Sequence, residues 1–132
     1  MVEKYLRVIV VAVTVLCAGV SVKAEVMCEA WVARYNGWAE GTDVVSAIAV
    51  DKGGNVYVTG YSFGYGSSYD YATIKYAPDG ETLWVRRYNG TGDYKDSASA
   101  LAVDNNGNVY VTGSSFGNNS SFSPDINFLY FI

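Results

Sequence analysis

Hydrophobic positions change their spacing once along the chain, near residue 24. Before that point, Val8 to Val20 form an apolar run without a charge, preceded by Lys4 and Arg7. After it, apolar and polar residues alternate over short segments separated by glycine-containing turns. Alternation with a period of two is typical of β-strands, and no helical period of useful length follows. The pattern therefore predicts a leader followed by an all-β region.

Residues 1–24 have the features of a secretory signal peptide. A basic start is followed by an apolar stretch that ends at Ala24, and this order is typical of exported precursors. The apolar run is shorter than the roughly 20 residues of a membrane-spanning helix. We therefore expect cleavage after Ala24 and a mature protein, residues 25–132, that is secreted, periplasmic or on the cell surface. An uncleaved anchor is the alternative, because Val22 is a mediocre residue for a cleavage site.

The alternating pattern predicts four strands in succession, joined by tight turns. Asp51 suits the first position of the turn between the first two strands, and Gly54 suits a residue with positive φ. Pro78 and Gly80 mark the turn before the fourth strand in the same way. The predicted strands are Ser46–Val50, Asn55–Tyr61, Asp70–Tyr76 and Thr82–Tyr88.

The same pattern occurs twice, at a fixed offset of 53 residues. The segment Trp31–Gly37 returns as Trp84–Gly90, and Asp43–Gly64 returns as Asp96–Gly117. About 24 of the 38 positions from residue 31 to residue 68 are identical at this offset. A period of about 40–50 residues rich in short strands is typical of the blades of a β-propeller. We therefore predict repeat 1 at about 31–83 and a truncated repeat 2 at about 84–132, each contributing to a four-stranded antiparallel blade.

The repeated run AIAVDxxGNVYVTGxSxG, at Ala47–Gly64 and Ala100–Gly117, resembles the bacterial β-propeller repeat family called SBBP. The segment DYATIKY at Asp70–Tyr76 is also similar to that family. The resemblance implies a secreted or cell-surface bacterial protein built of four-stranded blades. It implies no catalytic residues.

Two repeats make an incomplete propeller, since closed rings have about four to eight blades. The chain begins with what looks like a fourth strand, Trp31–Tyr35, and ends with up to three strands of a later blade. Residues 123–132 diverge from the third strand of the first repeat. The partners we expect are therefore other blades, in cis or in trans, including a homo-oligomer. The alternatives are a fragment of a longer propeller and a truncated reading frame.

Composition removes several classes of chemistry. The chain has no histidine and two cysteines, so the commonest general base and metal ligand are missing. Without residues 1–24 the net charge is about −6, which argues against nucleic acid or an anionic membrane as a partner. We expect no catalytic, cofactor-binding or metal-binding residue. Asp51 and Asp104 are interpreted as turn residues with Gly54 and Gly107, a calcium ligand being the less favoured alternative.

Two further groups of residues are candidates for catalysis or ligand binding. The carboxylates of Asp93 and Asp96 could in principle serve glycoside hydrolysis, but we interpret them as residues of a solvated loop. An aromatic segment rich in glycine and serine could contact a ligand such as a sugar, although packing between blades is the favoured interpretation. Its residues are Tyr61, Phe63, Tyr65, Tyr69 and Tyr71.

These observations favour a non-enzymatic scaffold or binding surface. The alternative is a lectin-like, carbohydrate-binding module that uses the aromatic segment.

Export generates a direct prediction. Protein purified from its native host should begin at Glu25, because the basic start, the apolar run and Ala24 together specify a signal peptide. N-terminal sequencing checks this, with total cell extract and the exported fraction compared side by side. An intact Met1 in a cytosolic fraction would contradict the prediction.

Overall fold

The computed structural model describes residues 8–9, 30–116 and 125–131, and the side chains of residues 30–116. Of the predicted leader only Val8–Ile9 is described, so the rest of the expected signal peptide lies outside these ranges. Both cysteines, Cys17 and Cys28, also lie outside them. Every described element is a β-strand, and no helix suited to crossing a bilayer occurs in the described ranges. The strands are β1 (Val8–Ile9), β2 (Val32–Ala33), β3 (Asp43–Val50), β4 (Val56–Phe63), β5 (Tyr69–Tyr76), β6 (Thr82–Tyr88), β7 (Ser97–Val103), β8 (Val109–Ser115) and β9 (Asp125–Phe131).

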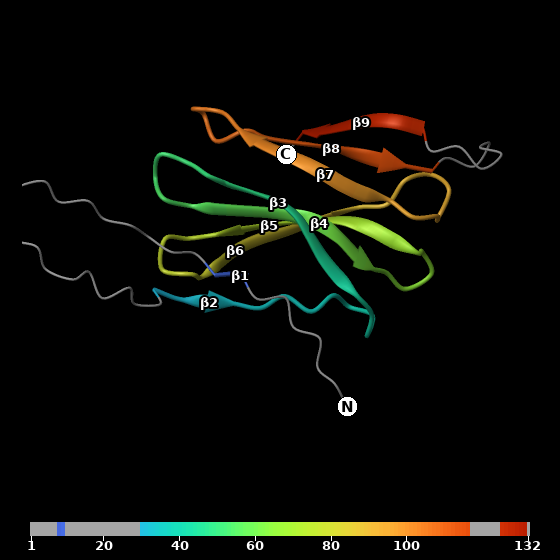
Figure 1. The fold of residues 1–132 in the computed structure, drawn as a ribbon, viewed down its shortest axis with the longest axis horizontal. Coiled ribbons are helices and arrows are strands. Elements are labelled where there is room, and N and C mark those ends of the chain that lie inside the picture. Colours follow the sequence, from blue (N-terminus) through green and yellow to red (C-terminus); the bar gives the residue numbers. More distant parts are fainter. Residues whose placement is uncertain (1–7, 10–29, 117–124, 132) are drawn as a thin grey trace, which may run out of the picture.

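Two antiparallel sheets make up most of the molecule, and a short pair of strands flanks them (Figure 1). The first sheet has the order β3-β4-β5-β6, which is one complete four-stranded blade, called blade 1 here. The second has the order β7-β8-β9 and is called blade 2. The predicted all-β blade architecture is thus confirmed, with the repeated GNVYVTG segments in central strands.

The strand boundaries differ slightly from the predicted ones. The fourth strand runs over the predicted residues, but β3 begins at Asp43 instead of Ser46 and β4 ends at Phe63 instead of Tyr61. The pairing is extended because a β-bulge between Val45 and Ala47 shifts the register and lets pairing continue beyond it. Sequence alternation breaks at a bulge, and for that reason it did not reveal the first residues of β3.

Two glycines in each blade have a steric reason. Gly54 and Gly107 close the first turn of their blades with φ of 80° and 85°, a region that other residues rarely adopt. Gly60 and Gly113 lie opposite the bulges, where a Cβ on Gly60 would meet the Val44 carbonyl oxygen. The final glycine of the repeated GNVYVTG sequence is therefore required by the bulged partner strand.

Each blade has two apolar faces. The N-face is turned toward the part of the chain that precedes the blade, and the C-face toward the part that follows it. The N-face of blade 1 carries Val56, Val58, Ile74 and Tyr76, and its C-face carries the ring of Tyr57. The C-face of blade 1 packs against the N-face of blade 2. The residues of this interface are Tyr57, Tyr71, Trp84 and Tyr88 from blade 1 and Ala98, Leu101, Val103, Val109 and Val111 from blade 2.

The segment Trp31–Tyr35 covers the N-face of blade 1. Trp31 packs on Tyr76 with ring centroids 5.7 Å apart, and its indole Nε1 donates to the Pro78 carbonyl oxygen at 2.9 Å. Trp84 and Tyr88, one repeat later, pack against the N-face of blade 2 in the corresponding way. The segment Trp31–Tyr35 therefore occupies the position of the fourth strand of a preceding blade, as predicted from the sequence.

The third strand of blade 2 is present although its sequence diverges. β9 pairs with β8 through Ser115 and Asp125, just as Ser62 pairs with Asp70 in blade 1. The offset between Asp70 and Asp125 is 55 residues instead of 53, and a register shift follows at Ser114. In this pairing Asp125 takes the position of Asp70, and the residues that follow Asp125 in β9 still differ from those that follow Asp70 in β5.

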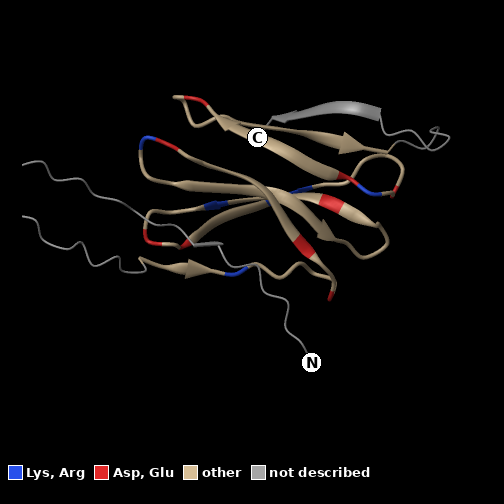
Figure 2. Ribbon diagram, in the orientation of Figure 1, with Lys and Arg blue, Asp and Glu red and all other residues tan. Residues whose placement is uncertain are grey.

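Charged residues gather at the turns and strand ends and leave the middles of the sheets largely uncharged (Figure 2). The Asp51, Asp79 and Asp104 turns lie at one end of the blades, which we call the turn end. The opposite end, called the loop end, is formed by residues 36–42, 64–68 and 89–96. Uncharged sheet centres are what blades stacked face to face require.

The burial of the central strands yields a stability prediction. Val58 and Val111 have 2% and 0% of their surface exposed. Val58→Asp or Val111→Asp should lower the free energy of unfolding by roughly 3 kcal/mol or more, because each places an unpaired charge in the core. Chemical denaturation monitored by circular dichroism measures the loss. Thr82→Asp, at an exposed strand position, is the control, and equal effects at all three positions would contradict the assignment of a core.

Candidate functional site

The aspartates that open the first turn of each blade are surrounded by donors. Oδ1 of Asp51 accepts from the backbone N–H groups of Gly53 and Asn55 at 2.8 and 2.9 Å. Its Oδ2 accepts from the Asn55 side-chain amide at 2.7 Å and from the Tyr57 hydroxyl at 3.0 Å. The hydrogen bond from the Asn55 side chain is the main reason that the pKa of Asp51 lies below its ordinary value.

Asp104 repeats this arrangement in blade 2. Its carboxylate accepts from the backbone of Asn106 and Asn108, the Asn108 side chain and the Tyr110 hydroxyl. Its pKa is also lowered, chiefly by the Asn108 side chain. The two Asp turns face each other across a groove of about 390 Å³ that Lys52 and Lys75 also line.

The donor sets around these carboxylates indicate a structural role. Four hydrogen bonds to each carboxylate hold the turn and the first residues of the next strand together, and they use the oxygen lone pairs that a cation would need. Among the residues that the structure describes, no group of three or more Asp, Glu, Cys or His side chains is placed to hold a metal ion.

A second pair of aspartates fixes the connection between blades. The backbone N–H of Gly37 donates to Asp43 Oδ2 at 3.1 Å, and that of Gly90 donates to Asp96 Oδ2 at 2.6 Å. Asp96 Oδ1 also accepts from the Phe116 backbone at 3.3 Å. The loop after each fourth strand is thus tied to the start of the next blade.

The burial of Asp96 corrects the interpretation of the Asp93 and Asp96 pair. Asp96 is fully buried, whereas Asp93 is exposed and accepts from the Asn89 side chain at 2.9 Å. Asp96 is buried because blade 2 lies against blade 1 at this point: its own N–H donates to the Tyr69 carbonyl oxygen at 2.6 Å. The two carboxylates therefore do not form a solvated pair.

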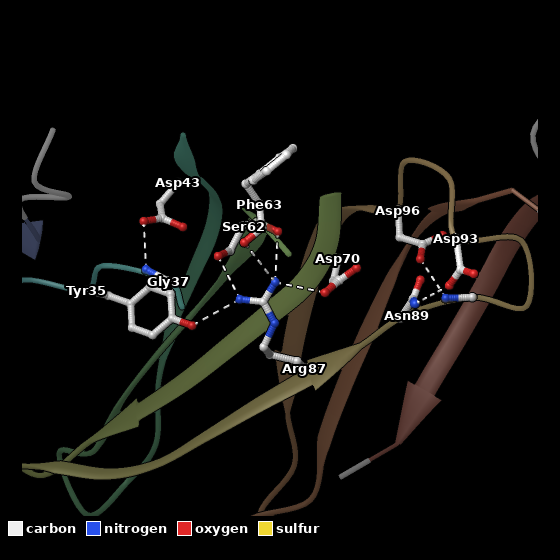
Figure 3. A network of polar contacts seen from close by, with 11 residues as sticks. Tyr35, Gly37, Asp43, Ser62, Phe63, Asp70, Arg87, Asn89, Asp93 and Asp96 are labelled. Carbon is white, nitrogen blue, oxygen red and sulfur yellow. Dashed lines mark hydrogen bonds and ion pairs between the residues drawn. The ribbon is translucent and has the colours of Figure 1, made fainter. Parts of the chain in front are cut away.

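Arg87 is the centre of a polar network at the loop end of blade 1 (Figure 3). Its Nη2 donates to Asp70 Oδ2 at 2.8 Å and to the backbone carbonyl oxygens of Ser62 and Phe63 at 3.0 and 3.3 Å. Its Nη1 donates to the Ser62 hydroxyl at 2.7 Å and to the Tyr35 hydroxyl at 3.3 Å. One guanidinium thus joins β4, β5 and β6 to the segment that covers the N-face.

Four of the five aromatic candidates are not in a loop. Tyr61 and Phe63 end β4, Tyr69 and Tyr71 begin β5, and Tyr65 lies in the loop between these strands. Tyr69 makes edge-to-face contacts with Tyr61 and Phe63 at centroid distances of 5.3 and 5.4 Å.

Lys95 covers part of this aromatic cluster. Its ammonium nitrogen lies 4.8 Å from the Tyr61 ring centroid and 5.7 Å from that of Tyr69. A cation over the face of a tyrosine is attracted by the ring quadrupole. Because Lys95 comes from the loop that leads into blade 2, the contact joins the two blades and occupies ring faces that a sugar would need.

Tyr71 belongs to the core. It is buried between the blades and packs on Tyr88 at a centroid distance of 5.6 Å. Burial first, and the nearby Asp96 carboxylate second, raise the pKa of Tyr71 to about 12. Its side chain is therefore out of reach of a ligand at the surface.

The remaining exposed aromatic side chains gather at the loop end. Tyr65 is 77% exposed and Phe63 is 37% exposed, and Trp38 and Tyr94 in the adjacent loops are exposed as well. Trp38 and Tyr94 were missed from the sequence, because both lie outside the aromatic segment at residues 61–71. Arg87 was missed as well. Its repetition, as Arg34 one repeat earlier, was a signal that distinguished it from Arg86, which corresponds to Ala33.

Comparison with known families agrees with the architecture. Residues 31–66 and 83–119 both match the SBBP β-propeller repeat, and together they make up more than half of the chain. The protein therefore belongs to the SBBP β-propeller repeat family. No curated protein matched the chain.

The Arg87 network generates a prediction with a matched control. Arg87→Met should lower the free energy of unfolding by about 3–5 kcal/mol, because it leaves the buried carboxylate of Asp70 without its counter-charge. Arg86→Met, at the neighbouring exposed position, should change stability by no more than about 0.5 kcal/mol. Urea denaturation of both variants measures the difference. Adding Asp70→Asn to Arg87→Met should recover part of the loss, and equal losses in the two single variants would overturn the assignment.

Proposed function

We propose that this SBBP repeat protein is a non-enzymatic, exported scaffold that presents a binding surface on stacked β-blades. The observation that carries the proposal is the use of the repeated carboxylates: Asp51 and Asp104 hold turns, and Asp43 and Asp96 hold the connections into each blade. Groups that could move protons in an enzyme are here committed to backbone N–H donors.

The buried charges support the same conclusion. Asp70 is paired with Arg87 inside blade 1, and the Arg87 guanidinium also contacts Ser62 of the same blade and Tyr35 of the covering segment. The guanidinium carbon also lies 5.9 Å from the centroid of the Trp38 ring. A catalytic acid–base pair needs two groups facing a shared, accessible space. The four repeated carboxylates instead accept from backbone N–H groups of the chain itself, which supports a structural role.

The binding surface we propose is the loop end. Its exposed aromatic residues are Trp38, Tyr65 and Tyr94, from three loops, and Phe63, from the end of β4. Aromatic side chains contribute large contact areas with few rotatable bonds, so they are common at protein interfaces. The acidic residues Glu40 and Asp93 are exposed in the same loops as Trp38 and Tyr94, so a protein partner at this end would also contact acidic side chains.

A lectin-like function is the second candidate, and Tyr65 is the observation that favours it. Its ring is exposed in a loop that contains Gly64 and Gly66, the latter with φ of 78°. An exposed ring on such a loop can stack on the apolar face of a sugar. Tyr61 and Tyr69 support this candidate less, because Lys95 already lies over their rings.

Glycan binding separates the two functions. The full chain should show no specific binding on a glycan array if the scaffold proposal holds. Specific binding that is lost in Tyr65→Ala and retained in Tyr94→Ala, which alters a matched exposed ring in another loop, would overturn the scaffold proposal in favour of the lectin. Binding lost equally in both variants would also overturn it, since both rings would then contact the sugar.

A further inference from the structure

We propose that copies of this chain join head to tail, with the C-face of blade 2 of one copy packed on the N-face of blade 1 of the next. The proposal rests on the stacked-blade scaffold described above and names its partner: a second copy of the same chain. The chain itself provides the comparison that supports it, because one interface of this kind already exists between its own two blades.

The N-face of blade 1 is only partly covered. Ile48 and Val50 on β3 are 53% and 57% exposed, on the same face as Val58. Their counterparts one repeat later, Leu101 and Val103, are half-buried and pack in the interface with blade 1. The two pairs occupy the same place in their blades and differ in whether a preceding blade is present, so the exposed pair marks a missing neighbour.

The C-face of blade 2 shows the reverse difference. Tyr57 in blade 1 is 0% exposed because blade 2 covers it, whereas its counterpart Tyr110 is half-buried. Ala49 of blade 1 is half-buried, and its counterpart Ala102 is exposed. Among the described residues, the N-face of blade 1 and the C-face of blade 2 are therefore each only partly covered.

The chemistry of these two faces selects a second copy as the occupant. At four positions of the first two strands, the C-face of blade 2 has the same residues as the C-face of blade 1, which already binds an N-face of this type. The two faces differ where Val44 and Tyr61 of blade 1 are replaced by Ser97 and Ser114. The identical pairs are Ala47 and Ala100, Ala49 and Ala102, Tyr57 and Tyr110, and Thr59 and Thr112. On the N-face, Val50, Val56 and Val58 are matched by Val103, Val109 and Val111. Docking between copies would thus repeat an interface that the sequence has already optimised.

The covering segment fits the same arrangement. β2 lies where the fourth strand of a preceding blade belongs, and blade 2 has three strands in the described part of the chain. An incoming blade 2 with strands β7, β8 and β9 would leave the place of its fourth strand to β2 of the receiving copy. In the full chain β2 is paired over two residues with β1, which belongs to the predicted leader.

Such an interface uses different surfaces on the two copies, so it can continue until a ring closes. The described residues of each copy form two blades. Because propellers have about four to eight blades, closed assemblies of roughly three or four copies are expected.

Substitutions at the exposed positions test the proposal. Ile48→Arg with Val50→Arg blocks the N-face, and Ala100→Arg with Ala102→Arg blocks the C-face. We expect the unmodified full chain to associate in analytical ultracentrifugation. Each double variant alone should associate at least about 100-fold more weakly, because a guanidinium without a partner would be buried in the interface. A mixture of the two variants should form a complex of two copies and stop there, since each variant retains one usable face.

Two controls keep the test specific. The variant with all four arginines has neither face, so association at full strength in that variant would show that the predicted leader or another surface drives it, and would overturn the proposal. Circular dichroism melts check that the variants fold, and Ile48→Ser with Val50→Ser replaces the arginine pair if it unfolds.

Two further outcomes also decide against the proposal. A monomeric full chain, or folded variants whose mixture forms no complex, would overturn head-to-tail assembly. Either result would leave the non-enzymatic scaffold in place, because that function is tested separately by the glycan array.

Discussion

A sheet that is apolar on both faces cannot stand alone in water, and this constraint organises the whole structure. The C-face of blade 1 is covered by blade 2, and the N-face of blade 1 is covered by the segment Trp31–Tyr35. Burial of apolar surface is worth about 25 cal/mol per Å², so each covered face is a large part of the stability of a small domain. The exposure of Ile48 and Val50 follows from the same constraint, because the covering segment is one strand wide.

Polar groups in this fold serve to position strands. The aspartate turns repeat with the same four donors in both blades, and the Asp43 and Asp96 contacts fix the connections into them. Arg87 adds a link that is specific to blade 1 in the described residues, since its partner Asp70 begins β5. Charges placed in this way stabilise the ends of the blades and leave the faces free to stack.

The proposed binding function depends on the side chains at the ends of the blades. The turn end is occupied by saturated carboxylates, whereas the loop end carries exposed rings that differ between the two repeats. Trp38 and Tyr94 come from loops that share a place in the repeat but not a sequence. A surface built from unrepeated residues on a repeated frame can vary without any change in the stacking of the blades.

The architecture of one blade could be predicted from the sequence alone. Strand order, the turn glycines Gly54 and Gly107, and the fourth strand Thr82–Tyr88 all follow from local alternation and turn chemistry, which act between residues close in the chain. The interpretation of Trp31–Tyr35 as a fourth strand of a preceding blade also came from the repeat alone. The contacts between the two blades could be seen only in the folded protein. Asp96 and Tyr71 are buried where blade 2 lies on blade 1. At the same junction Lys95 contacts the rings of Tyr61 and Tyr69. These contacts join residues far apart in the sequence, and a periodic pattern records which side of a strand a residue occupies but not what packs against that side.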